Sequence, residues 1–373
     1  MTAFGKRTVL FFASFLAAAT CLHAAQVKPV DLPRLTTSVA IDFCNGTPSA
    51  PGLTPAEATV RPRATFPDVD QKESSEGWVR LDFTIAADGS TRDIVATDRL
   101  GSEDIVKSAT KALSLARYRP ATVNGQPIAQ YNNNFEFLYR FEDVSRQAEH
   151  AEFVSKYDRG RALLRNRKYG EATAVLESAY QLRLNLYELA MLSYALALTY
   201  AGTNDTPRAL LNIRHAAIEG GIFLERKVAP PVRRLRLKLE AMNSNYRYVA
   251  CSPPFAEADP FEDDEEDRKE VTRIVTEVRA AITNPAPLAL EGKLATNPWI
   301  GGAAMWEHGL LRRKFAFDSI KGTVRNLVLA CWTQVIESPV NETSQWSIPE
   351  SAGRCTLRVY GEPGATFRLI EEW

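Results

Sequence analysis

Hydrophobic and polar residues alternate along residues 77–85, and this alternation is the clearest pattern in the chain. Large apolar side chains occupy every second position there, at Val79, Leu81, Phe83 and Ile85. A period of two is typical of a half-buried strand. Asp88-Gly89 then favours a tight turn, because glycine tolerates the positive φ that such a turn needs, and the alternation resumes over residues 92–98. The pattern therefore predicts a β-hairpin.

After Ser102 the apolar spacing changes to three and four residues, which predicts an amphipathic helix over residues 102–116. Ser102 is suited to cap the helix, and Glu103 with Asp104 would favour the positive end of the helix dipole. We expect a break at residues 118–121, a turn at 124–125, and a third strand over 133–140. The helix is expected to cover one face of the sheet.

This order of elements resembles the C-terminal domain of TonB, the energy-transducing protein of Gram-negative envelopes. The shared motifs are a Pro-x-x-x-aromatic-Pro segment at 62–67, Asp88-Gly89, Tyr118-Arg119-Pro120-Ala121, Asn124-Gly125 and Phe135-x-Phe137. The resemblance implies a small α/β domain over residues 62–143. It also implies that the domain binds an extended peptide of an outer-membrane receptor by adding a strand to the edge of its sheet.

The resemblance further suggests which residues contact the partner, namely Phe66, Pro67, Phe135, Phe137 and Tyr139. Phe66 stands where the family has the tyrosine of a Tyr-Pro signature, so a phenolic hydrogen bond is absent there. An alternative interpretation is that Phe66 and Pro67 only fix the start of the domain.

Residues 146–245 have a helical pattern that repeats after 37 positions. The recurring positions are Leu163, Ala172, Leu176 and Ala179, followed by Tyr200, Ala209, Ile213 and Ala216. Small residues at fixed positions allow helices to approach closely, as stacked helix pairs require. The region resembles tetratricopeptide repeats, and residues 232–239 are expected to form a capping helix.

The N-terminus carries Lys6 and Arg7 before a long apolar run, which predicts a secretory signal peptide over residues 1–25. A periplasmic location would follow, with residues 26–61 as an extension. The alternative is an uncleaved inner-membrane anchor, because residues 8–25 lack a formal charge.

An exported chain allows disulfides, and four cysteines remain after the signal: Cys44, Cys251, Cys331 and Cys355. Three pairings are possible. We favour Cys331 with Cys355, because both lie in neighbouring β-like runs, and Cys44 with Cys251. The cysteines lack the spacing of a zinc site, so no metal is expected.

Residues 252–268 form an acidic stretch that is expected to be a linker, and residues 269–373 have a β-rich pattern. Five of the six tryptophans lie in this last region. Exposed tryptophans could stack on the sugars of peptidoglycan, whereas buried ones would fill a small β-sandwich. The predicted fold class is thus α+β multidomain, with a TonB-like domain, helical repeats and a β-rich domain.

Motifs for catalysis are not found in the sequence, and we expect no enzyme, catalytic residue or cofactor. After the signal only His150, His215 and His308 remain, and we expect His308, beside Glu307, to lie in a loop. The formal net charge is zero, which gives no support to nucleic-acid binding. The sequence favours a periplasmic scaffold protein that binds a protein or extended peptide, with an outer-membrane receptor as one such partner. The alternatives are a divergent energy transducer in the inner membrane and a peptidoglycan-associated protein.

Overall fold

The computed structural model describes residues 52–141, 150–252, 265–298 and 301–373. The described residues form two compact units. The first comprises residues 54–224 together with Asn297, Pro298 and Gly301, and the second comprises residues 225–296 and 302–373. The predicted signal peptide and most of the predicted extension and acidic linker lie outside the described residues.

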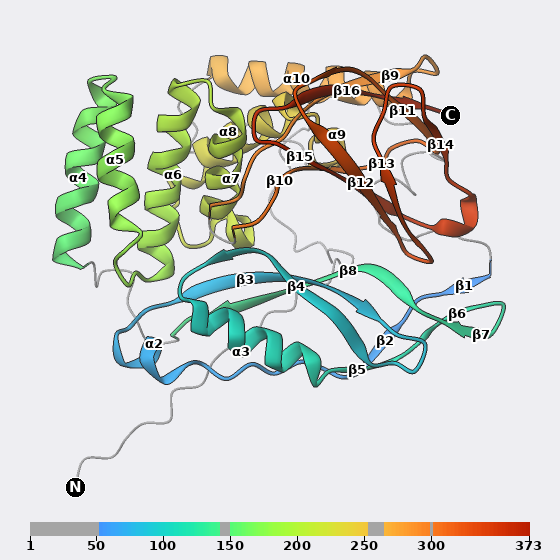
Figure 1. The fold of residues 1–373 in the computed structure, drawn as a ribbon. Helices are drawn as coiled ribbons and strands as arrows, with labels where there is room; N and C mark the ends of the chain where they lie inside the picture. The colour runs from blue at the N-terminus through green and yellow to red at the C-terminus, as the bar shows by residue number, and fades with distance from the viewer. Residues whose placement is uncertain (1–51, 142–149, 253–264, 299–300) are drawn as a thin grey trace, which may run out of the picture. The chain divides into compact units, whose positions relative to one another are not determined.

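The first unit contains the predicted hairpin, helix and third strand (Figure 1). Strands β3 (Gly77–Ile85), β4 (Thr91–Leu100) and β8 (Gln130–Tyr139) form an antiparallel sheet in the order β4-β3-β8. Helix α3 (Glu103–Ser114) begins where predicted, and the Ser102 hydroxyl accepts a hydrogen bond from the backbone N–H of Ile105. The local sequence pattern was therefore sufficient to place these four elements.

Short elements surround this sheet. Helix α2 (Asp68–Lys72) precedes it, and β2 (Glu57–Val60) pairs with β5 (Arg117–Arg119). Strands β1 (Leu53–Thr54), β6 (Ala121–Val123) and β7 (Gln126–Ile128) form another small sheet. The predicted end of the helix is confirmed, because α3 ends at Ser114 and the residues at the predicted break belong to β5 and β6. Strand β5 pairs with the distant β2, and β6 pairs with the neighbouring β7.

The core of this domain lies between the sheet and α3. Val79, Leu81, Ile105 and Leu113 are fully buried there. Phe66 joins them from outside the sheet, stacked on Phe141 with ring centroids 4.6 Å apart. The alternate apolar side chains of the strand thus lie on one face of the sheet, and α3 covers that face and shields it from water.

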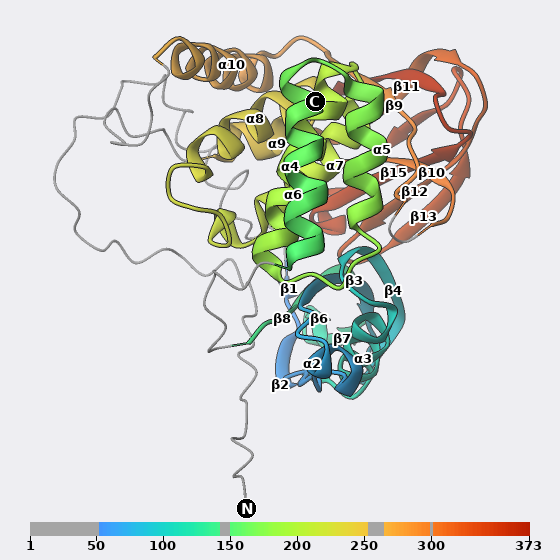
Figure 2. The same ribbon diagram turned by 90° about the vertical axis from the view of Figure 1, so that its left-hand side faces the viewer.

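Four helices complete the first unit: α4 (Ala151–Arg165), α5 (Tyr169–Ala179), α6 (Leu186–Gly202) and α7 (Thr206–Ala216), followed by the short η1 (Ile218–Gly221). Figures 1 and 2 show α4 beside α5, and α6 packs against α5 and α7. The predicted small positions are buried at these contacts: Ala172, Ala179, Ala209 and Ala216. Gly160 of α4 also faces the side chain of Leu176, with no room for a Cβ atom.

The second unit combines helices α8 (Ala229–Met242), α9 (Tyr246–Cys251) and α10 (Glu265–Thr283) with a β-sandwich. One sheet has the order β10 (Ala304–Gly309), β15 (Cys355–Gly361), β12 (Val324–Cys331) and β13 (Val335–Pro339). The other has the order β14 (Gln345–Ser347), β11 (Lys314–Lys321), β16 (Thr366–Glu372) and β9 (Leu288–Lys293), and η2 (Glu350–Ala352) precedes β15. Helix α8, which includes the predicted capping segment, packs against α9 and α10.

Two tryptophans of the sandwich take part in its packing. Trp306 is buried between His308 and Phe367, and Trp346 stacks on Phe315 with ring centroids 5.1 Å apart. Trp306 therefore matches the buried interpretation, whereas Trp346 is half-buried and packs against the core. Trp373 is 52% exposed, and Trp299 lies outside the described residues.

The predicted disulfide between Cys331 and Cys355 is confirmed. The two residues are directly opposite each other in the pairing of β12 with β15. Cys251 is also disulfide-bonded, but its predicted partner Cys44 lies outside the described residues. Across the described residues, no helix is long and apolar enough to cross a membrane.

Candidate functional site

The edge of the TonB-like sheet is the first candidate site. Strand β8 pairs with β3 on one side, and across the described ranges no strand pairs with its other side. Unpaired N–H and C=O groups along such an edge can accept an additional strand from another chain. This is the geometry that the predicted peptide binding requires.

Only part of β8 is accessible to a partner. Phe137 and Tyr139 are 1% and 0% exposed and belong to the core, whereas Phe135 is half-buried and packs on Phe137. At the other end, Asn132 has a positive φ of 56° next to an irregularity in the pairing with β3. The regular and accessible stretch is therefore residues 133–136.

The predicted partner-binding residues thus divide into two groups. The side chains of Phe66, Phe137 and Tyr139 are buried, so they shape the domain and leave contact with a peptide to the β8 backbone and to Phe135. Pro67 is the N-cap residue of α2, and Phe66 contacts Phe141 and Tyr139. For Phe66 and Pro67, these contacts favour the interpretation that they fix the start of the domain.

Strand β4, at the opposite edge, is less suited to accept a strand. It carries exposed Arg92 and Asp93, and its pairing with β3 is interrupted at two places. Asp93 also has a positive φ of 53°. Charges and bulges are the usual means by which sheet edges avoid additional strands.

Strand β8 carries fewer charges than β4. Glu136 is its single charged residue, and the Glu136 carboxylate accepts a hydrogen bond from Trp78 Nε1 at 3.2 Å.

Buried carboxylates join the TonB-like domain to the helices of the same unit. Asp98 on β4 accepts hydrogen bonds from Nε2 of His215 at 2.8 Å and from Nδ2 of Asn297 at 3.1 Å. Burial by itself would raise the pKa of Asp98, but the charge and hydrogen bond of His215, together with Asn297, outweigh it and lower the pKa.

Glu76 forms a second junction immediately before β3. Its carboxylate accepts hydrogen bonds from the backbone N–H of Phe141 at 2.7 Å and of Leu186 at 2.9 Å. Its own backbone N–H donates to the carbonyl of Leu184 at 3.0 Å. Burial is the largest influence on this carboxyl and raises its pKa, which the two N–H groups only partly offset.

Asp70 forms a third junction from α2. It is fully buried and accepts hydrogen bonds from the Ser102 hydroxyl at 2.8 Å and from Arg183 at 3.0 Å. Arg183 also pairs with Glu73. Because each junction connects the α/β domain to the helices or to the Asn297 segment, the first unit is a single packed body and not two modules on a string.

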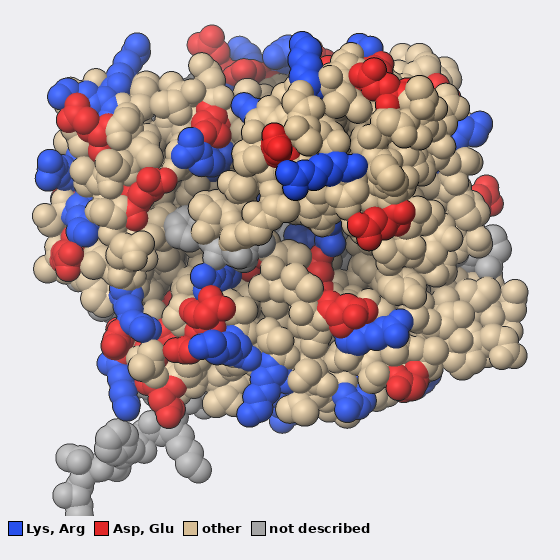
Figure 3. All heavy atoms as spheres, viewed as in Figure 1, with Lys and Arg blue, Asp and Glu red and all other residues tan. Residues whose placement is uncertain are grey.

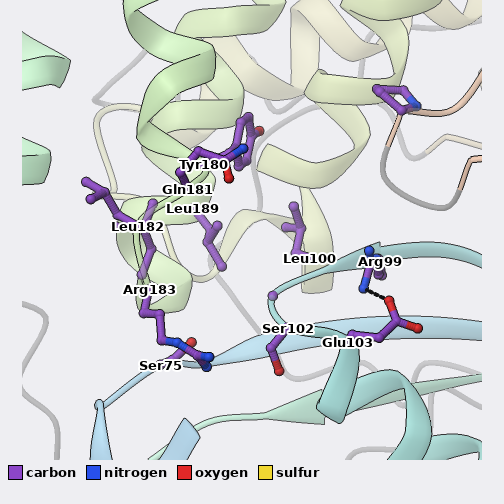
Figure 4. Close-up of a pocket in the computed structure, with 13 residues that line it drawn as sticks. Ser75, Arg99, Leu100, Ser102, Glu103, Tyr180, Gln181, Leu182, Arg183 and Leu189 are labelled. Atoms are coloured by element: carbon purple, nitrogen blue, oxygen red, sulfur yellow. Dashed lines mark hydrogen bonds and ion pairs between the residues drawn. The ribbon is translucent and has the colours of Figure 1, made fainter.

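A pocket of about 460 Å³ lies at this junction (Figure 4). Leu100, Leu184 and Leu189 give it an apolar floor. Arg183 lies on one side, and the ion pair of Arg99 with Glu103 lies on the other. Both arginines are already paired with carboxylates, so the pocket has a mixed polar and apolar lining with a neutralised rim.

The three histidines that the structure describes all contact carboxylates. His150 Nδ1 lies 2.8 Å from Glu188, and His215 contacts Asp98 as described above. The predicted loop position of His308 is wrong: it lies on β10, and its Nε2 is 2.7 Å from Glu371 on β16. Sequence reasoning missed Glu371 because it lies 63 positions from His308 on a strand of the other sheet, and only the packing of the two sheets brings the two side chains together.

Among the described residues, no group of histidine, cysteine and acidic side chains could hold a metal ion. On the face drawn in Figure 3, Lys and Arg side chains are interspersed with Asp and Glu. That face therefore carries no broad field of one sign.

Comparisons with known proteins find matches for the TonB-like part of the chain. Residues 62–140 match the family described as Gram-negative bacterial TonB protein C-terminal. Among solved structures, the solution NMR structure of the Pseudomonas aeruginosa TonB CTD is similar at 22% identity and a TM-score of 0.23, over 25% of this chain and 92% of that chain. No curated protein matches the chain.

Residues 62–140 therefore form a TonB-type C-terminal domain, on the basis of the family match. The match ends before the helical region, so the tetratricopeptide character of residues 146–245 stays a prediction.

Proposed function

We propose that this chain is a periplasmic, non-catalytic protein-binding protein whose TonB-type domain holds an extended peptide along β8. The observation that supports this most directly is the sheet order β4-β3-β8, which leaves β8 at an edge. Contact of TonB C-terminal domains with outer-membrane receptors makes such a receptor the first candidate partner, and transport across the outer membrane the corresponding role.

The accessible stretch of β8 determines which class of ligand can bind there. Residues 133–136 offer backbone groups over about four positions, so main-chain hydrogen bonds supply affinity with little sequence preference. Phe135 adds an aromatic ring that remains half-buried beside Phe137. A peptide with alternate apolar side chains would use both features, because every second side chain would face the same side as Phe135.

The remainder of the chain would act as a scaffold in this proposal. The helices of the first unit are joined to the TonB-type domain by Asp70, Glu76 and Asp98. They would hold the domain in one orientation relative to whatever the helices contact.

A photo-crosslinking experiment in the native envelope tests the proposal. A photoreactive phenylalanine analogue replaces Asn134, which is the exposed residue of β8, and in a matched variant it replaces Val95 on β4, which is 58% exposed. Crosslinks to another protein are expected from position 134 and not from position 95. Mass spectrometry then identifies the partner.

The outcomes separate the possible roles. An outer-membrane receptor crosslinked at 134 would make this a transport component, and a periplasmic protein would make it a peptide-binding adaptor. Equal crosslinking from both positions, or none from either, would contradict binding along β8.

A further inference from the structure

Basic side chains gather around the turn between α4 and α5 in the first unit. Residues 158–171 contain two acidic residues, Asp158 and Glu171, and five basic ones, which are Arg159, Arg161, Arg165, Arg167 and Lys168. All five basic residues are exposed. Five positive charges against two negative ones leave an excess of three at this end of the helix pair. Residues 159–168 are called the basic turn below.

Most of this positive charge is not neutralised within the protein. Lys168 pairs with Glu171 at 3.1 Å. Across the ranges that the structure describes, Arg159, Arg165 and Arg167 form no ion pair with a carboxylate. A guanidinium group stays charged at any physiological pH, so these three arginines present their charge to the solvent.

The backbone brings the basic side chains to one end of α4. Arg161 and Arg165 are four residues apart on this helix, so their side chains are neighbours on its surface. The backbone N–H of Lys168 donates a hydrogen bond to the carbonyl of Leu163 at 3.0 Å. This bond folds the chain back against the last turn of α4. Arg167 and Lys168 therefore lie beside Arg165.

The turns after α4, α6 and α8 have the same backbone, which shows what this turn requires. Each has a residue of positive φ directly after the C-cap: Arg167 with 57°, Asn204 with 56° and Ser244 with 58°. Glycine, and after it asparagine, suits this position at the end of a helix, because other side chains are strained there. The backbone conformation therefore disfavours an arginine at 167.

Lys168 is disfavoured by the local structure as well. It is the N-cap residue of α5, and its side chain makes no capping hydrogen bond. Before α7, by contrast, Asp205 is the N-cap residue and accepts a hydrogen bond from the backbone N–H of Arg208 at 3.2 Å. A positive charge at the start of a helix also opposes the helix dipole. Residues that violate local preferences are typical of functional positions, and here the shared property of Arg167 and Lys168 is their charge.

The basic turn lies away from the β8 edge. The segment that follows α5 contacts the TonB-type domain, because Arg183 pairs with Asp70 and the carbonyl of Leu184 accepts a hydrogen bond from Glu76. Helix α5 has 11 residues and is about 16 Å long, so its first residues lie at the opposite end. Figures 1 and 2 both show the α4–α5 turn at the end of the helices that points away from β3. The basic turn is thus a surface separate from the one proposed for the peptide.

The composition of the basic turn indicates the kind of partner. Residues 165–168 are exposed, and none of them is apolar. Protein–protein interfaces are centred on aromatic and apolar anchors, which this stretch lacks. A cluster of Lys and Arg side chains, however, binds an anionic lipid surface through charge alone. We infer that the basic turn binds the anionic headgroups of a phospholipid membrane.

Co-sedimentation of the full chain with lipid vesicles tests the inference. Vesicles of phosphatidylcholine that contain phosphatidylglycerol are compared with vesicles of phosphatidylcholine alone, at low and at physiological salt. The double variant Arg165→Gln, Arg167→Asn removes two charges, and asparagine suits the positive φ at 167, so the variant should fold at least as well as the wild type. We expect it to bind the anionic vesicles about tenfold or more weakly than the wild type does.

Lys107→Gln, Lys111→Gln is the matched control. Both lysines are exposed on α3 of the same unit and are four residues apart. This variant also loses two positive charges, and it should bind the anionic vesicles as the wild type does. Residues 1–25 are common to all three proteins, so a difference between the proteins reports on the substituted positions.

Several outcomes would overturn the inference. These are wild-type binding that does not depend on phosphatidylglycerol, equal affinity in the wild type and the Arg165, Arg167 variant, and an equal loss of affinity in the control. Binding to soluble polyglutamate without binding to anionic vesicles would identify an acidic protein as the partner instead. Circular dichroism verifies that each variant is folded, and Arg159→Gln, Arg161→Gln replaces the first double variant if that one does not fold.

Discussion

Asp98 and His215 are separated by 117 positions in the chain, yet their side chains form a 2.8 Å hydrogen bond. Asp98 lies on the edge strand β4 of the TonB-type sheet, and His215 lies on α7 and is 1% exposed. This pair connects two regions that the sequence patterns present as separate modules. It therefore provides a direct test of whether the first unit unfolds as one body.

Replacing Asp98 with Asn should alter the pH dependence of stability. The pKa of Asp98 is lowered in the folded state, so its contribution to stability is present above its unfolded pKa of about 3.9 and is lost as the pH falls below that value. The wild type should lose this contribution to its stability in acid. Asp98→Asn should be less stable than the wild type at neutral pH, and its free energy of unfolding should change less with pH. Urea denaturation between pH 3 and 7 measures the free energy of unfolding of both proteins. If the two plots of this free energy against pH run parallel, Asp98 does not make the proposed contribution.

Removing the Glu76 side chain should weaken the junction next to β3. Glu76→Ala leaves the backbone N–H groups of Phe141 and Leu186 without their acceptor, and we expect a loss of about 2 kcal/mol in the free energy of unfolding. Glu171→Ala, at an exposed glutamate paired with Lys168, is the control and should change stability by less than about 0.5 kcal/mol.

The same substitution also has a pH signature. Burial raises the pKa of Glu76 in the folded state. The contribution of Glu76 to stability is therefore complete below its unfolded pKa of about 4.3, and it declines as the pH rises through the folded-state pKa. The difference in stability between wild type and Glu76→Ala should therefore narrow with increasing pH. A difference that widens over this range would show that the carboxylate is not desolvated.

The Cys331–Cys355 disulfide should stabilise the sandwich through the unfolded state. It closes a loop with a sequence separation of 24, for which chain entropy predicts about 3 kcal/mol. The double variant Cys331→Ala, Cys355→Ala should lose about this amount in guanidinium denaturation. If the two units unfold together, the loss should appear in their single unfolding transition; if they unfold separately, it should appear only in the transition of the second unit.

A larger side chain at Gly160 should separate α4 from α5. A Cβ atom there would overlap the buried side chain of Leu176, so Gly160→Val is expected to cost about 1–3 kcal/mol in stability. Gly170 in α5 has open space around it, and Gly170→Ala should be neutral or gain up to about 1 kcal/mol. Thermal unfolding measures the change in stability of each variant relative to the wild type. Equal changes in Gly160→Val and Gly170→Ala would argue against close packing at Gly160.

The sequence determined the local elements of this protein. Alternation over residues 77–85 gave β3, the spacing after Ser102 gave α3, and the repeated small residues marked where helices approach each other. These features follow from side-chain periodicity, which depends on neighbours within a few positions. The pairing of Cys331 with Cys355 could also be predicted, because both cysteines lie in neighbouring strand-like runs.

Only the tertiary structure decided which of these residues can meet a partner. Phe137 and Tyr139 alternate as an edge strand should, but α3 and Phe66 cover them, so the accessible edge is shorter than the strand. The partners of Asp98, Glu76 and His308 likewise come from distant segments. Burial and buried hydrogen bonds depend on how elements pack across the whole chain, and no local pattern encodes that information.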